Sequence, residues 1–186
     1  RTHFTWPTGL ALSRDGNVYV SDEYEDAIVV FPPDRIYEFP WFDPDGEQIG
    51  RWGESGSGIG QLAGPSGIEF DADDNLLVVE SGNNRIQRFT KEGEHLACYG
   101  GSGSGSGELS RPWGICLDKD SNVYVADWRN DRIVAFSPDG KYQATFGGQH
   151  GSAVGQFDRP SKAGRSQNKR RQRLARSTDI QHSRAT

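Results

Sequence analysis

A segment of about 47 residues occurs three times in tandem in this chain of 186 residues. The segments begin near three prolines, and a fourth proline stands at the same phase after the third segment: Pro7, Pro65, Pro112 and Pro160. The first segment is longer than the others by an insertion between Phe31 and Gly46. A chain with such a repeat folds as an array of similar units, each resting on its neighbours, rather than around one central core.

Each segment has the pattern of four short strands. The third segment shows it most clearly, with β-rich runs at 114–118, 123–127, 132–136 and 142–147. Asp, Asn and Gly between the runs favour tight turns and antiparallel pairing. One such sheet cannot bury its own faces, so neighbouring sheets must stack, as the blades of a β-propeller do. The sequence therefore predicts an all-β fold of about three four-stranded antiparallel propeller blades.

Several short motifs recur together in the segments. They are Pro-x-Gly-Ile/Leu, Asp-x-Asn-Val-Tyr-Val-x-Asp, Asn-x-Arg-Ile-x-x-Phe, Asp-Gly and Gly-x-Gly-x-Gly-x-Leu/Phe. Over about residues 6–160 this pattern resembles the NHL repeat. The resemblance implies a six-bladed propeller that binds protein or RNA, in some relatives attached to a ubiquitin ligase. A few related propellers are lyases or lactonases.

The resemblance also divides the chain. Residues 1–160 are predicted to hold three blades, at about 7–63, 64–111 and 112–159. Because three blades make half of a six-bladed ring, we expect missing blades of a longer chain to complete it, with a homodimer as the second route. A start at Arg1 and the absence of methionine fit a piece of a longer protein.

Residues 161–186 differ in composition from the rest of the chain. They contain eight basic residues, one acidic residue and almost no apolar ones, a pattern that predicts a basic, disordered tail. Such a tail is either an arm for nucleic acid or localisation, or sequence foreign to the propeller.

A carboxylate ends the second predicted strand of each segment: Asp22, Glu80 and Asp127. If the three converged, they would suit calcium, which prefers oxygen ligands. The alternative is that each accepts hydrogen bonds within its own blade. Arg85 and Arg132 follow the second and third carboxylates by five residues and are expected to pair with them, whereas the first segment has Ala27 there.

Large side chains break the repeat on one predicted face, where the Pro-x-Gly turns meet the loops between second and third strands. They are Trp6, Tyr24, Trp113, Trp128 and Arg129. Trp, Tyr and Arg dominate binding hot spots, so we expect this face to bind a protein or peptide. The alternative is that an aromatic ring fills a gap under its loop.

Single-stranded RNA is the alternative ligand, because bases stack on aromatic side chains. Residues 1–160 carry a net charge of about −12, which repels phosphate. RNA binding would therefore need a local basic patch, for which the candidates are Arg85, Arg88, Arg129 and Arg132.

Enzymatic function is not predicted. A lyase-like or lactonase-like propeller would need a central metal, and the four histidines share no metal-ligand spacing. Gly58–Ala63 matches a dinucleotide fingerprint by letter but recurs in register, as a connector between blades would. Cys98 and Cys116 are expected in the core, and no run approaches a membrane span. No catalytic residue, metal or cofactor is therefore assigned.

The insertion in the first segment is rich in aromatic residues: Tyr37, Phe39, Trp41 and Phe42. Ordinary surface loops are polar, and prolines stiffen this one. We expect it either to fold back over its blade or to act as a secondary binding loop.

Overall fold

Residues 4–33 and 48–161 are described by the computed structural model, and they form three separate four-stranded sheets. The first sheet, blade 1, consists of β1 (Pro7–Leu12), β2 (Val18–Asp22), β3 (Ala27–Phe31) and β4 (Gly50–Trp52). Blade 2 consists of β5 (Pro65–Phe70), β6 (Leu76–Glu80), β7 (Arg85–Phe89) and β8 (His95–Gly100). Blade 3 consists of β9 (Pro112–Leu117), β10 (Val123–Asp127), β11 (Arg132–Phe136) and β12 (Tyr142–Gly147).

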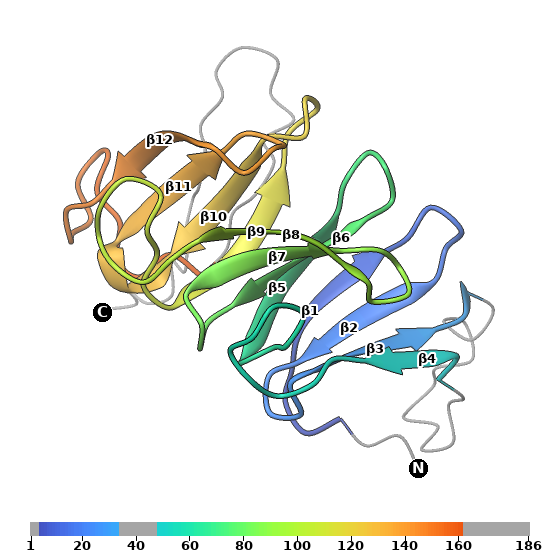
Figure 1. Ribbon diagram of the computed structural model, residues 1–186. Coiled ribbons are helices and arrows are strands. Elements are labelled where there is room, and N and C mark those ends of the chain that lie inside the picture. Colours follow the sequence, from blue (N-terminus) through green and yellow to red (C-terminus); the bar gives the residue numbers. More distant parts are fainter. Residues whose placement is uncertain (1–3, 34–47, 162–186) are drawn as a thin grey trace, which may run out of the picture.

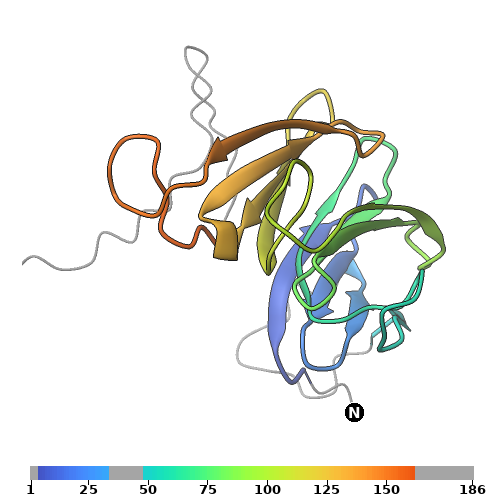
Figure 2. The same ribbon diagram turned by 60° about the vertical axis from the view of Figure 1, so that its left-hand side comes forward.

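Each strand pairs with the next one along the chain in antiparallel fashion, so every blade is a simple meander. Figures 1 and 2 show the three sheets stacked side by side, with β1, β5 and β9 on the inner side of the stack. A 3-10 segment, η2 (Trp128–Asn130), lies between β10 and β11. The predicted all-β fold of partial propeller blades is thus confirmed. Within the described ranges no helix has the length and apolar character needed to cross a membrane.

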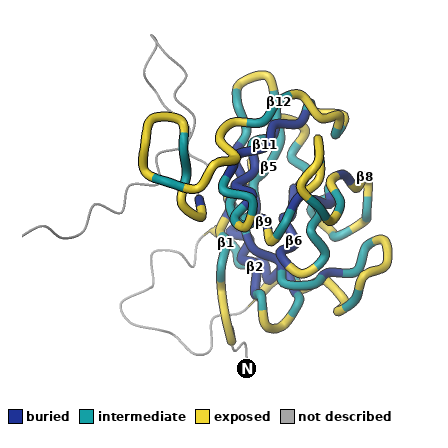
Figure 3. Tube along the Cα trace, turned by 90° about the vertical axis from the view of Figure 1, so that its left-hand side faces the viewer, coloured by how far each residue is buried: buried dark blue, intermediate teal, exposed yellow. Residues whose placement is uncertain are grey.

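The hydrophobic core lies between the blades rather than inside any one of them. In β6, Leu76 and Val78 belong to the cluster shared with blade 1, whereas Leu77 and Val79 belong to the cluster shared with blade 3. The middle blade is therefore buried on both faces, and Figure 3 shows its strand β6 in the buried class. Each sheet gains its stability from its neighbours, as the repeat predicts.

The two cysteines differ in their environment. Cys116 is buried, as expected, but Cys98 is exposed. The prediction was wrong for Cys98 because it lies on β8, the outermost strand of its sheet, where the pattern of apolar residues does not reveal which side faces water.

The glycine of the Pro-x-Gly motif allows the inner strands to approach each other. A Cβ at Gly9 would lie 2.3 Å from the carbonyl oxygen of Ser66, and one at Gly67 would lie 2.6 Å from that of Trp113. Both distances are shorter than any normal contact, so no larger residue fits where neighbouring inner strands meet.

A second contact between blades pairs an aromatic ring with a turn glycine. The Trp52 ring of blade 1 packs against Gly93 of blade 2, and Tyr99 of blade 2 packs against Gly140 of blade 3 in the same way. A Cβ at either glycine would lie 2.7 Å from the ring, and both glycines have positive φ angles. The glycine of the Asp-Gly motif, which follows Glu92 in blade 2 and Asp139 in blade 3, therefore serves the turn and the blade interface at once.

The glycine tracts form connectors from the outer strand of one blade to the inner strand of the next. Connector 1 (53–64), connector 2 (101–111) and connector 3 (148–160) each close on a parallel bridge. The bridges are Ser55 to Leu62, Ser102 to Leu109 and His150 to Phe157. The predicted connector role is confirmed for connectors 1 and 2, which lead into β5 and β9.

Some sequence predictions concern residues outside the described ranges. The aromatic insertion with Tyr37, Phe39, Trp41 and Phe42 is one, and the basic tail after Ser161 is the other. Both stay predictions.

Replacement of Gly67 by alanine is expected to lower the free energy of unfolding by about 1–3 kcal/mol, because the added methyl group would collide with the backbone of blade 3. Urea denaturation measures the loss. The control is Gly101→Ala, since a Cβ there meets no atom within 4 Å. Equal stability of the two variants would contradict this account of the inner strands.

Candidate functional site: the loop face

We call one end of the three sheets the loop face: it carries the β2–β3, β6–β7 and β10–β11 loops and the connectors (Figure 1). Strand register places the start of each inner strand beside the end of the second strand. The paired residues are Pro7 with Asp22, Pro65 with Glu80, and Pro112 with Asp127. The three carboxylates therefore lie directly under the loop face.

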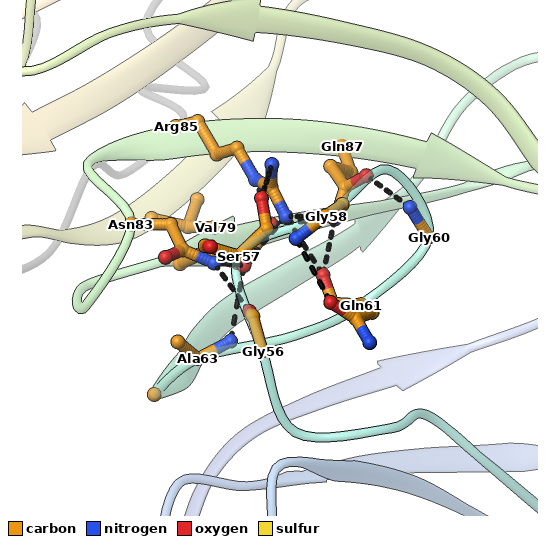
Figure 4. A network of polar contacts seen from close by, with 12 residues as sticks. Gly56, Ser57, Gly58, Gly60, Gln61, Ala63, Val79, Asn83, Arg85 and Gln87 are labelled. Atoms are coloured by element: carbon orange, nitrogen blue, oxygen red, sulfur yellow. Dashed lines mark hydrogen bonds and ion pairs between the residues drawn. The ribbon is translucent and has the colours of Figure 1, made fainter.

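The Glu80 carboxylate is fully buried, and Figure 4 shows the residues that donate to it: Ala63, Asn83, Arg85 and Gln87. It accepts hydrogen bonds from Ala63 N at 3.0 Å, Asn83 Nδ2 at 2.6 Å and Gln87 Nε2 at 2.7 Å. Arg85 Nε lies 2.7 Å from it and completes a buried ion pair. Asp127 has equivalent partners in Ser110, Asn130 and Arg132. The interpretation that each carboxylate accepts hydrogen bonds within its own blade is confirmed for Glu80 and Asp127.

The arginine of each pair also holds the preceding connector. Arg85 donates to the carbonyl oxygens of Ser57, Gly58 and Gln61, at 2.8–2.9 Å. Arg132 donates in the same way to Ser104, Gly105 and Glu108, at 2.7–3.0 Å. We call this arrangement, with its carboxylate, the arginine latch. Asn83 and Asn130 add one bond each, to the carbonyl oxygens of Gly56 and Gly103.

The latch engages two of the residues that were predicted to bind a ligand. Arg85 and Arg132 were candidates for ligand binding, but their guanidinium groups are largely buried and saturated by partners within the protein. We therefore assign both to the scaffold and leave them out of the proposed binding surface. Arg88 is engaged as well, in ion pairs with Asp71 and Asp73. These side chains do not form the open basic patch that RNA binding would need.

Blade 1 uses its carboxylate differently, because Ala27 replaces the arginine. Asp22 Oδ1 accepts hydrogen bonds from Trp6 N at 3.0 Å and Tyr24 N at 3.1 Å, and Oδ2 accepts one from Thr5 N at 2.8 Å. One buried carboxylate thus fixes the backbone of both aromatic residues. Their side chains remain 62% exposed for Trp6 and 72% exposed for Tyr24.

Blade 3 presents a second group on the loop face. Trp128 begins η2 immediately after the buried Asp127, and the guanidinium carbon of Arg159 lies 5.1 Å from the centre of the Trp128 ring. Arg129 is exposed, and its backbone N–H donates to Ser110 O at 3.0 Å. Trp113 is half-buried in β9. The structure therefore places the predicted residues in two groups, one on each end blade.

One group of potential metal ligands occurs within residues 4–33 and 48–161. Donor atoms of Asp131, His150 and Asp158 all lie within 4.8 Å of one another, on the rim of connector 3. His150 Nδ1 is 3.3 Å from Asp131 and 3.6 Å from Asp158. The sequence did not reveal this group, because the spacing of the three residues follows no metal-binding motif. It lies beside a third strand rather than on the inner strands, so it is not a central metal site.

Replacement of Arg132 by alanine is expected to lower the free energy of unfolding by about 3–5 kcal/mol at about pH 7, because Asp127 would be left buried without its cation. Burial already raises the pKa of the Asp127 carboxyl, and bonds from Ser110, Asn130 and Arg132 oppose that rise. Without the arginine the pKa rises further, so the carboxyl becomes neutral as the pH falls. The deficit should then shrink towards about pH 4.

Urea denaturation across this pH range measures the effect. Arg129→Ala is the matched control, since that side chain is exposed and its loss should change stability by less than about 0.5 kcal/mol. A deficit for the Arg132 variant that does not depend on pH would show that Asp127 is not the group left unpaired.

Comparison with known proteins agrees with this architecture. The family model for the NHL repeat matches residues 62–89 and 109–136. Each match runs from the end of a connector through the third strand of a blade, and so contains one carboxylate and one latch arginine. No curated protein sequence matches the chain.

Solved structures resemble the chain in fold. Virginiamycin B lyase from Staphylococcus aureus, in a complex with quinupristin, aligns with a TM-score of 0.59 and 18% identity, over 86% of this chain and 45% of that one. A chain of the nidogen/laminin complex gives 0.59 and 22%, over 84% and 51%. Kuenenia stuttgartiensis hydrazine synthase gives 0.62 and 13%, over 90% and 41%.

The chain spans about half the length of these structures, which include a lyase and a component of a protein complex. Identities this low show the common fold alone. Together with the repeats and the matching family model, they show that the chain contains NHL repeats and that its three sheets have the fold of β-propeller blades.

Proposed function

We propose that this chain is a non-catalytic propeller module that binds a protein or peptide through its loop face. The proposal rests on how the structure holds Trp6 and Tyr24. Their backbones are fixed by one buried carboxylate, while their side chains are more than half exposed. Large aromatic side chains held in water on a rigid backbone are typical of binding surfaces.

Rigid presentation favours affinity. The backbone N–H groups of Trp6 and Tyr24 are bonded before any ligand arrives, so docking orders little more than the two side chains. In blade 3, the backbone next to Trp128 is held by the single turn of η2 and by the bond from Arg129 N to Ser110 O. Such preorganisation reduces the entropic cost of association.

The blade 3 group also indicates the chemistry of the ligand. Arg159 stacks near the Trp128 ring, and Arg129 is exposed beside it. A ligand segment with an aromatic or aliphatic residue next to an acidic one would satisfy both the ring and the guanidinium groups. Because the net charge of about −12 on residues 1–160 repels a chain of phosphates, the proposal favours a largely apolar peptide with one acidic residue over single-stranded RNA.

The test uses peptides that are selected from a random library for binding to the purified protein. Trp128→Ala and Trp6→Ala are each expected to weaken binding of selected peptides by about 30-fold, the loss typical of an interface hot spot. Leu96→Ala is the control, because Leu96 is an exposed apolar residue on the outer strand β8, away from both groups. Isothermal titration measures the affinities.

Two results would contradict the proposal. Peptides that bind both tryptophan variants as tightly as the native protein would place the binding surface elsewhere. A single-stranded RNA oligonucleotide that binds more tightly than any peptide, with affinity falling steeply as salt rises, would favour the RNA alternative instead.

A further inference from the structure

A cavity of about 250 Å³ lies between blades 2 and 3, at the end of the sheets opposite the loop face. Three turns border it: the β5–β6 turn (71–75), the β9–β10 turn (118–122) and the β11–β12 turn (137–141). Its lining combines apolar side chains with one ion pair: Leu77, Leu117, Val123 and Pro138, with Asp71 and Arg88. Because both blades are described in full, the cavity does not depend on how the chain continues at either end.

The equivalent place between blades 1 and 2 is filled by side chains of the protein itself. Three positions there carry a larger residue than their counterparts at the cavity: Tyr19 for Leu77, Phe70 for Leu117 and Lys91 for Pro138. The rings of Tyr19 and Phe70 meet edge to face with their centres 4.9 Å apart, and Tyr19 Oη donates to Lys91 O at 3.4 Å. The cavity between blades 2 and 3 therefore lies where the other junction places a phenol ring.

Two polar atoms beside the cavity lack hydrogen bonds within the described part of the chain. The side chain of Asp71 is 6% exposed, and its Oδ1 accepts bonds from the backbone N–H groups of Asp73 and Asn75. Its Oδ2 forms an ion pair with Arg88 Nη2 at 2.5 Å but accepts no hydrogen bond, and the buried Nε of Arg88 has no acceptor. Since unmet hydrogen-bonding groups are costly when buried, both atoms favour a ligand that bonds to them.

The lining indicates the chemistry of that ligand. Arg88 Nε needs an acceptor and Asp71 Oδ2 needs a donor, and a single hydroxyl group can serve both. The apolar walls suit a flat ring, on whose face a guanidinium can also pack. An apolar cavity of about 150 Å³ is already large enough for benzene. Two exposed carboxylates, Asp73 and Asp120, also border the cavity and disfavour an anion.

We propose that this cavity is a binding site for a small neutral phenol. The ring lies against Leu77, Leu117 and Val123, and the hydroxyl group donates to Asp71 Oδ2 and accepts from Arg88 Nε. The site is separate from the loop face, so it does not rest on the proposed function.

Phenol and toluene are the probes, because they have the same size and shape and differ in the hydroxyl group. In NMR titrations the methyl signals of Leu77, Leu117 and Val123 should shift until saturated, with a Kd for phenol below about 1 mM. Toluene should bind at least about tenfold more weakly, since it makes neither hydrogen bond. The methyl signals of Leu76 and Val78, which face blade 1, should not move and serve as the internal control.

Two variants test the walls and the polar group separately. Leu77→Tyr supplies the ring that blade 1 has at this position, so phenol binding should be lost while the melting temperature stays the same or rises. Leu77→Met is the matched control, since it conserves volume and should keep phenol binding. Arg88→Lys keeps the charge beside Asp71 but removes Nε, so phenol should bind about tenfold more weakly and toluene with unchanged affinity.

Three results would overturn the proposal. Phenol that binds the folded Leu77→Tyr variant as tightly as the native protein would lie elsewhere. Toluene that binds as tightly as phenol would remove the assigned roles of Asp71 and Arg88. The absence of saturable shifts up to about 10 mM phenol would reject the site itself. None of these measurements uses a peptide, so failure here is distinguishable from failure of the proposed function.

Discussion

The interaction on which the rest of the structure depends is the arginine latch. One buried carboxylate fixes the arginine of its own blade, and that arginine binds three carbonyl groups of the connector before it. A glycine-rich connector has many accessible conformations and no core of its own, and donors from the next blade satisfy its carbonyl groups and restrict that freedom. A planar guanidinium with five donors can satisfy several of them at once. The latch thereby joins consecutive blades by polar contacts, in addition to the apolar core between their faces.

At the loop face the same carboxylate position is used in two ways, one for the stability of the scaffold and one to fix the backbone of exposed aromatic residues. In blades 2 and 3 the carboxylate serves the latch, and in blade 1 it binds backbone N–H groups and holds Trp6 and Tyr24 in place. Holding the two aromatic residues in place requires little further ordering of the backbone, since the scaffold already orders it. A surface that is rigid for reasons of stability is also suited to recognition.

Sequence reasoning was most successful where the cause is local. The strands of blade 3 begin and end close to the predicted positions, because turn residues and the alternation of side chains act over a few residues. The pairing of Arg85 with Glu80 was predictable, since residues on either side of a short loop face each other across a hairpin. The exposure of Cys98 and the meeting of Asp131 with His150 were not, because both depend on how a strand or connector lies against distant parts of the chain.

By itself the sequence determined that three similar sheets stack, that Asp, Asn and Gly mark the turns, and that carboxylate and arginine pair within a blade. Those outcomes depend on chain geometry, turn chemistry and periodicity, which every segment of the chain carries. Only the tertiary structure decided that the two arginines donate to carbonyl groups of the connectors, that Trp6 and Tyr24 share one carboxylate, and that connector 3 keeps carbonyl groups without donors among the described residues. The reason is that each of these depends on which backbone atoms a neighbouring blade brings within hydrogen-bonding distance.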